Sequence, residues 1–376
     1  MAMSAPPARP FRADHIGSLL RPEALLQARR RAGAGEIDET SLREIEDAHI
    51  ESIIRFQEDI GLQSITDGEF RRESWRLGFV HKVEGFRLAD AVGAVDLQQD
   101  DTGERRAIGA APLAESRIRR TGPIVVDEAA FVRARTGRTP KITMPAPSYL
   151  HYPRGDACVL PEIYTDIEAF FADVVEVYVE EIDALHGAGI RYLQLDEVAQ
   201  PVLCDDNIRE AVRARGDDPD ALIGRYIDLI NRIARRRPKD MLLAVHMCRG
   251  NAMGKWMASG SYDRIAERTF NTLEVDALFL EYDSPRAGGF EPLRFMPPDK
   301  TVVLGLVSTK TPALESRELL KRRIESASEF VALERLCLSP QCGFSSHSLG
   351  TSLTFDDQAA KLRLVVETAE DVWSGG

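Results

Sequence analysis

The residues best suited to chemistry in this 376-residue chain are one histidine and several cysteines and carboxylates that follow apolar runs. His246 and Cys248 are two residues apart at the end of the run LLAVHMC. In a β-strand, residues i and i+2 point to the same face, so this imidazole and this thiolate can converge on one ion. With Cys342 and Glu281, which follow other apolar runs, they form a tetrahedral ligand set suited to zinc. The H-x-C spacing alone fits equally a buried cysteine beside an unrelated histidine.

Polar and acidic residues end other apolar runs in the same way. One run ends in Ile16-Gly17-Ser18, a second in Asp67-Gly68-Glu69 and a third in Gln194-Leu195-Asp196-Glu197. A chance distribution would scatter such side chains, so their position at run ends indicates a common site. Each of these carboxylates has a structural alternative, because acidic residues also cap helix starts.

The elements that must position these residues alternate along the chain. Near-continuous apolar runs are typical of strands buried on both faces of a parallel sheet. Eight such runs are present: Phe11–Ser18, Gln63–Glu69, Lys141–Ser148, Arg191–Glu197, Met241–Cys248, Ala277–Asp283, Thr301–Val307 and Leu336–Phe344. The segments between them have helical periodicity, most clearly Ser41–Ile60, Asp166–His186, Asp217–Arg236, Glu315–Phe330 and Phe355–Trp373.

Eight strands alternating with helices predict an α/β fold, a closed (β/α)8 TIM barrel, formed as a single domain over residues 1–376. An open doubly wound sheet is the second choice, but no G-x-G-x-x-G follows the first run, so a dinucleotide fold has no support. Active sites of such barrels lie at the C-terminal ends of the strands, where the candidate residues fall. We expect residues 1–10 to be flexible.

Residues 85–140 contain more chain than a connection between strand and helix needs. The polar sequence QQDDTGERR lies within this excursion, and a hairpin with a short helix near Asp127–Arg135 is expected there. The excursion is interpreted as an insertion. A lid, an oligomer contact that would make the protein a homo-oligomer, and a plain solvated insertion all fit the sequence.

The overall composition restricts the class of partner. The chain has 60 acidic and 48 basic residues, and its net charge of -12 argues against nucleic acid and against an anionic membrane surface. No apolar run approaches the length of a membrane span, and the N-terminus lacks the apolar region of a secretory signal. Five cysteines in a chain of this length predict a cytoplasmic protein with reduced thiols.

Six motifs in order carry a resemblance to a known family: HIGSLLRP, DGEFRR, QLDE, HMCRGN, LEYDSPR and LSPQCGF. Over residues 12–372 the chain resembles the catalytic half of cobalamin-independent methionine synthase, especially the short members that lack the N-terminal duplicated barrel. The resemblance implies a (β/α)8 barrel and zinc held by His246, Cys248, Glu281 and Cys342. It also implies that the amino-acid part of homocysteine is held by Ile16, Ser18, Glu69 and Asp196.

In this family a methyl group passes from N5 of a methyltetrahydrofolate to the thiol. Full-length members carry a histidine after the seventh strand, thought to protonate the leaving folate nitrogen, and the corresponding position here is Lys310, the expected catalytic residue. The tryptophan on which the pterin packs is absent after the third strand, where Tyr149 or Tyr152 could substitute.

These departures leave two further hypotheses. Related zinc enzymes alkylate thiols with other electrophiles, as the epoxyalkane:coenzyme M transferases do. A non-catalytic barrel stabilised by zinc is the third hypothesis, although the placement of Glu69 and Asp196 at the predicted rim speaks against it. The small-molecule partners expected on the first hypothesis are homocysteine and a methyltetrahydrofolate.

Overall fold

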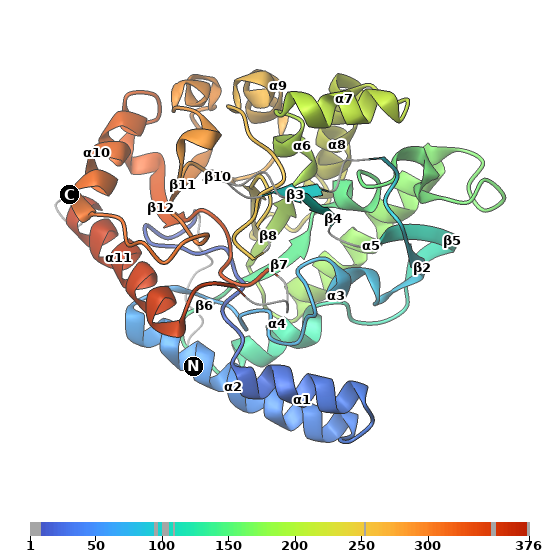
Figure 1. The fold of residues 1–376 in the computed structure, drawn as a ribbon, viewed down its shortest axis with the longest axis horizontal. Coiled ribbons are helices and arrows are strands. Elements are labelled where there is room, and N and C mark those ends of the chain that lie inside the picture. Colours follow the sequence, from blue (N-terminus) through green and yellow to red (C-terminus); the bar gives the residue numbers. More distant parts are fainter. Residues whose placement is uncertain are drawn as a thin grey trace.

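The computed structural model describes residues 9–93, 97–99, 105–107, 110–251, 253–346 and 351–373. At its centre, six parallel strands form one sheet in chain order, with helices outside it (Figure 1). The strands are β7 (Ile142–Pro145), β8 (Tyr192–Glu197), β9 (Leu242–Met247), β10 (Ala277–Glu281), β11 (Thr301–Val307) and β12 (Leu336–Pro340). Their near-continuous apolar sequences fit this arrangement, because every residue of these six strands is buried.

The remaining two runs close the sheet into a barrel. Strand β1 (Ser64–Ile65) pairs in parallel with β6 (Thr139–Pro140), which leads directly into β7. On the other side, the first run lies against β12, where the amide of Asp14 donates to the carbonyl of Leu338 at 3.0 Å. The fold is therefore the predicted α/β barrel, and the open sheet is excluded.

Two of the predicted strands are less regular than the sequence indicates. Of the run Phe11–Ser18, only Ala13 forms a β-bridge, and β1 covers two residues of the run Gln63–Glu69. Side-chain hydrogen bonds take the place of the missing backbone pairing between these strands. Asp14 accepts them from Ser64 Oγ (2.7 Å), Tyr192 Oη (2.8 Å) and Lys141 Nζ (3.1 Å). This buried polar network joins the first four runs at a place where the first two have few backbone hydrogen bonds.

Alternation along the strands separates the inside of the barrel from its outside. A small cluster fills the barrel interior: Ile16, Tyr192, Leu242, Ala244, Ala277, Phe279, Val303 and Cys337. On β9, Leu242 and Ala244 therefore face the barrel interior. Because alternate residues of a strand share a face, His246 and Cys248 at the C-terminal end face the same side. By the same alternation, Glu281 on β10 and Asp196 on β8 face this side too.

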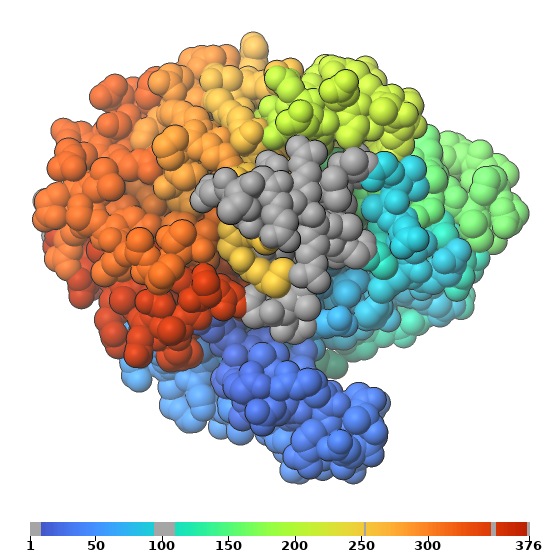
Figure 2. All heavy atoms as spheres, viewed as in Figure 1, coloured from blue at the N-terminus to red at the C-terminus, as the bar shows by residue number. Residues whose placement is uncertain are grey.

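The helices that the periodicity predicts are all present, with ends shifted by a few residues. They are α2 (Glu39–Ile60), α5 (Ile167–Gly187), α8 (Pro219–Ala234), α10 (Arg317–Ser328) and α11 (Phe355–Trp373). The structure adds α1 (Glu23–Gly33), α3 (Leu77–Val80), α4 (Val126–Arg133), α6 (Ala199–Val202), α7 (Asp206–Ala214) and α9 (Asp263–Thr272). Helix α1 projects from the lower edge of the molecule (Figure 2). Within the described residues, no helix combines the length and apolarity that crossing a membrane requires.

The excursion at 85–140 contains two antiparallel pairs and a helix. Strand β2 (Val83–Ala89) pairs with β5 (Ala111–Arg120), and β3 (Leu97–Gln99) pairs with β4 (Arg105–Ala107). Helix α4 follows close to its expected place, and β2 and β5 lie at the edge of the molecule beside α5 (Figure 1). The extent of the domain and the status of the excursion as an insertion stay predictions. The expected flexibility of residues 1–10 falls mostly outside the described residues.

Candidate metal centre

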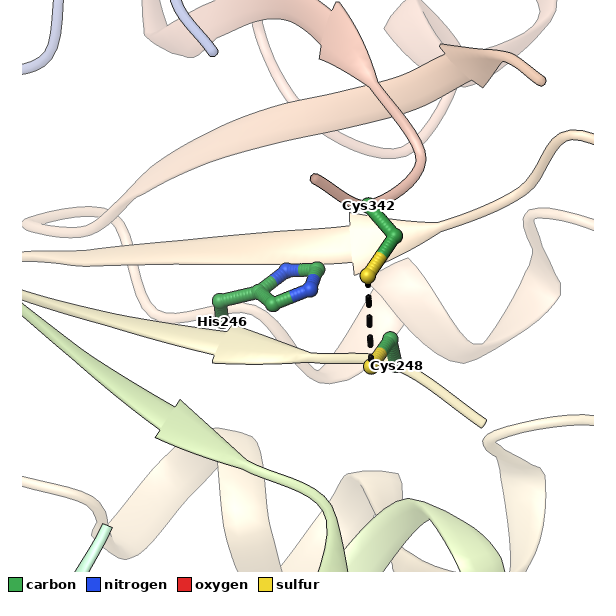
Figure 3. A group of neighbouring side chains, drawn as sticks. All are labelled: His246, Cys248 and Cys342. Atoms are coloured by element: carbon green, nitrogen blue, oxygen red, sulfur yellow. Dashed lines mark hydrogen bonds between the residues drawn. The ribbon is translucent and has the colours of Figure 1, made fainter. Parts of the chain in front are cut away.

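Three potential metal ligands meet at the C-terminal end of the barrel. His246 ends β9, Cys248 follows it, and Cys342 lies just after β12. Their ligand atoms all lie within 4.8 Å of one another, and the two sulfur atoms are 3.9 Å apart. Figure 3 shows the imidazole ring pointing toward both sulfur atoms. The i, i+2 spacing of the first two residues therefore does place their side chains on one face.

The chemistry of these three side chains fits zinc. Both ring nitrogens of His246 are buried and have no hydrogen-bond partner within the described residues, as expected of a nitrogen reserved for a metal. Two sulfurs that share a tetrahedral zinc at about 2.3 Å would lie about 3.8 Å apart, close to the observed separation. The contact between the two cysteines lowers the pKa of the Cys342 thiol well below its usual value and raises the pKa of Cys248, so it favours one thiolate in the pair.

The predicted fourth ligand, Glu281, has other partners in this structure. One carboxylate oxygen accepts from the backbone amide of Arg249 at 2.6 Å. The other contacts Arg286 Nη2 at 2.5 Å and Lys310 Nζ at 3.3 Å. Burial by itself would raise the pKa of Glu281, but Lys310, Arg249 and Arg286 together lower it to about 2. Its carboxylate lies outside the group formed by His246 and the two cysteines, so its ligation of zinc stays a prediction.

One pocket contains the three potential ligands and the four residues expected to bind the amino acid. Its lining is Ile16, Ser18, Glu69, Trp75, Arg76, Tyr149, Tyr152, Asp196, Val198, Ala199, His246, Cys248, Gly250, Asn251, Met257, Cys342, Gly343 and Ser346. The pocket therefore places a soft metal-ligand set beside two carboxylates. Lys310 is not part of this lining; its side chain is 6% exposed and contacts Glu281.

The two pocket carboxylates differ in their surroundings. Glu69 has a left-handed backbone with a φ of 61°, and its Oε1 accepts from Thr143 Oγ1 at 2.8 Å. Its Oε2 is buried with no hydrogen-bond partner within the described residues. Asp196 accepts from Gln194 Nε2 at 2.7 Å, and burial raises its pKa to about 7. A cationic group in the pocket would compensate both carboxylates.

Aromatic residues from two loops form another wall of the pocket. The ring of Trp75 meets that of Tyr149 edge-on, with centroids 5.1 Å apart, and Arg76 lies 5.3 Å from the centroid of the same tyrosine. Tyr152 also lines the pocket, so both tyrosines considered as substitutes for the missing tryptophan are at the site. Trp75 and Arg76 were not predicted, although they lie only three and four residues after the end of the DGEFRR motif.

Comparisons with known proteins agree with this geometry. Residues 11–371 match the family described as "Cobalamin-independent synthase, Catalytic domain". The chain is 41% identical to the uncharacterized protein YxjH of Bacillus subtilis (strain 168), over 97% of this chain and 95% of that protein. It is 25% identical to the methionine synthase of Pyrococcus furiosus, over 87% of this chain and 84% of that one.

Two solved structures share the fold. One is a Listeria monocytogenes protein assigned as a vitamin-B12 independent methionine synthase, with 33% identity, a TM-score of 0.74 and coverage of 97% of this chain and 98% of that chain. The other is a B12-independent methionine synthase from Shewanella sp. W3-18-1 in complex with selenomethionine, with 18% identity, a TM-score of 0.71 and coverage of 96% and 98%. The chain thus belongs to the cobalamin-independent methionine synthase family, as a form built on the catalytic barrel.

Proposed function

We propose that this protein is a zinc-dependent methyltransferase that passes a methyl group from a methyltetrahydrofolate to the thiol of homocysteine, forming methionine. The observation that carries the proposal is the shared pocket of His246, Cys248 and Cys342 with the carboxylates of Glu69 and Asp196. The candidate ligands line a pocket that also contains two carboxylates, which suits a catalytic rather than a closed structural zinc site. Family membership supports methyl transfer as the reaction class.

In the proposed reaction, one set of pocket residues would hold the zinc and another would bind the amino-acid part of the substrate. Held by His246 and the two cysteines, zinc would supply the positive charge that keeps a substrate thiol deprotonated at neutral pH. Glu69 and Asp196 bind the α-ammonium group of homocysteine, and Ile16 and Ser18 complete the amino-acid site. In the transfer, a sulfur–carbon bond forms and the bond between the methyl carbon and folate N5 breaks. N5 keeps the electron pair and takes up a proton.

Lys310 is proposed as a slow source of that proton, and its replacement by histidine tests whether lysine limits the rate. Histidine is the side chain that most often acts as a general acid near neutral pH, and lysine acts in this role less often. We therefore expect slow turnover of methyltetrahydrofolate by the wild type and a rise of about tenfold or more in Lys310→His. The measurement is the rate of methionine formation by both proteins from pH 6 to pH 9. Fast wild-type turnover that collapses in Lys310→His would show that lysine is the evolved acid.

One observation favours a second candidate, a zinc thiol alkyltransferase that uses another electrophile. Lys310 presents a cation beside Glu281 where full-length members of the family have a histidine. A strained electrophile such as an epoxide needs less help from an acid, because its carbon is already reactive. A cation near the opening oxygen would stabilise the developing charge.

A product assay separates the two candidates. Zinc-loaded protein would be incubated with homocysteine or coenzyme M against a panel of methyl and alkyl donors, and products identified by mass spectrometry. The proposed function requires methionine from homocysteine and a methyltetrahydrofolate. Alkylated coenzyme M without methionine would establish the second candidate instead.

A further inference from the structure

We infer that Glu128, on helix α4 outside the barrel, is a positioning residue for the substrate ammonium group, because it binds Arg72 and so leaves Glu69 free to bind that cation. The inference rests on the proposed function, in which Glu69 receives the ammonium of homocysteine. It gives the excursion at residues 85–140 a role in the site.

Arg72 lies between two carboxylates and is bound more closely by the one outside the pocket. Its Nε contacts Glu128 Oε2 at 2.8 Å, whereas its Nη1 is 3.7 Å from Glu69 Oε1. Nη1 instead donates to Thr143 Oγ1 at 2.9 Å, and the threonine hydroxyl donates on to Glu69 Oε1 at 2.8 Å. The side chains of Arg72, Glu128 and Glu69 are no more than 3% exposed, so water screens their charges weakly.

This arrangement leaves Glu69 with a longer ionic contact to Arg72 than Glu128 has. Glu69 lines the pocket; its Oε1 accepts one hydrogen bond from a neutral hydroxyl, and its Oε2 has no hydrogen-bond partner within the described residues. The nearby Arg21 guanidinium donates to the backbone carbonyl of Glu69 rather than to its carboxylate. Because Arg72 pairs more closely with Glu128, an incoming ammonium group would be the cation that pairs with Glu69.

The charge of Glu128 is itself secured by a second cation. Lys82 Nζ contacts its other oxygen, Oε1, at 3.0 Å. Burial would raise the pKa of Glu128, but Arg72 and Lys82 outweigh that effect and lower it. Glu128 is thus a carboxylate that can compete with Glu69 for the guanidinium of Arg72.

Helix α4 is fixed to the barrel layer by another buried carboxylate. Glu181, on α5, accepts hydrogen bonds through Oε1 from the backbone amides of Ile124, Val125 and Val126 at 3.0, 2.6 and 3.0 Å. Its Oε2 accepts from Arg120 Nε at 2.6 Å. The start of α4 is therefore anchored to a barrel helix, and Glu128 lies two residues into α4 from this anchor.

The test compares two thiols by calorimetric titration of the zinc-loaded protein. Homocysteine carries the ammonium group, and 4-mercaptobutanoate is the same molecule without it. In Glu128→Gln, Arg72 is left to pair with Glu69, so homocysteine should bind about tenfold more weakly while 4-mercaptobutanoate changes little. Glu128→Asp keeps the charge and should restore most of the affinity. Asp127→Asn, an exposed neighbour on the same helix, should bind both thiols as the wild type does.

Three outcomes would contradict the inference. Wild-type affinity for homocysteine in Glu128→Gln would overturn it, and so would an equal loss for both thiols, which indicates a purely structural role. In both cases the proposed function would still be supported if the wild-type protein binds homocysteine more tightly than 4-mercaptobutanoate. A wild type that binds the two thiols equally would contradict the proposed amino-acid substrate, and the inference with it. If Glu128→Gln does not fold, Glu128→Asp carries the comparison, with a smaller loss confined to homocysteine.

Discussion

Replacing Cys342 with serine is expected to remove most of the zinc and with it the activity. The three potential ligands are each buried and meet within 4.8 Å, so a hydroxyl in place of one sulfur removes one of the donors that would hold the ion. Changes in residues that only support a metal ligand typically weaken affinity by about ten- to a hundredfold. Loss of a ligand should cost more than that. Elemental analysis of the purified variant after dialysis measures the effect.

Cys337→Ser is the matched control. Cys337 is also fully buried, but it belongs to the barrel interior, and its sulfur lies 3.7 Å from the carbonyl of Pro10. A serine there can make the same contact without touching the metal centre. This variant should keep its zinc. Equal zinc content in Cys342→Ser and Cys337→Ser would refute the assignment of the metal centre.

The second large effect is expected from Asp196→Asn, which removes a negative charge from the pocket and keeps its shape. A charge-assisted hydrogen bond is worth about 1.5–3 kcal/mol. Homocysteine should therefore bind roughly ten- to a hundredfold more weakly, with zinc content unchanged. Calorimetric titration with homocysteine measures the loss.

Asp240→Asn serves as the control for this substitution. Asp240 precedes β9 at the opposite end of the barrel, where it is half-exposed and pairs with His186 and Arg191. Its replacement should leave homocysteine affinity as it is. Normal homocysteine binding by Asp196→Asn would mean that the thiol substrate is not an α-amino acid, and coenzyme M or a similar thiol would become the better candidate.

The parts of the site that could be predicted are those encoded by short-range periodicity. His246 and Cys248 share a face because strand side chains alternate. This rule can be applied to two residues that are two positions apart, without knowledge of the rest of the fold. The helices were predictable for the same reason, and α2 and α11 end where the periodicity ends. Cys342 could be placed at the rim because every parallel strand of a barrel ends at the same edge.

What could not be predicted depends on contacts between distant segments. The charged partners of Glu281 are Arg249, Arg286 and Lys310. No short-range sequence pattern shows that these three residues surround one carboxylate. The bond from Arg72 to Glu128 joins residues 56 positions apart across the excursion. The polar sequence of the insertion predicts a solvated surface, and it does not show that Glu128 is buried against the barrel.

The shortness of β1 has a similar origin. The run Gln63–Glu69 predicts a full strand, but Ser64 is tied through its hydroxyl to Asp14, and the chain turns at Glu69 with positive φ. Backbone strain of this kind is found at functional sites more often than elsewhere. The sequence indicates strand propensity, whereas the site requires Glu69 to face the pocket.

The most direct test of the account is whether a substrate thiol binds to the metal. Cobalt-substituted protein would be titrated with homocysteine while the absorption of the metal centre is recorded. The account predicts stronger thiolate-to-cobalt charge-transfer absorption that saturates at one thiol per metal, because the residues that would hold the ion line the pocket expected to bind the thiol. A fully cobalt-loaded protein whose spectrum does not change on adding homocysteine would show a closed structural site and would contradict the proposed function.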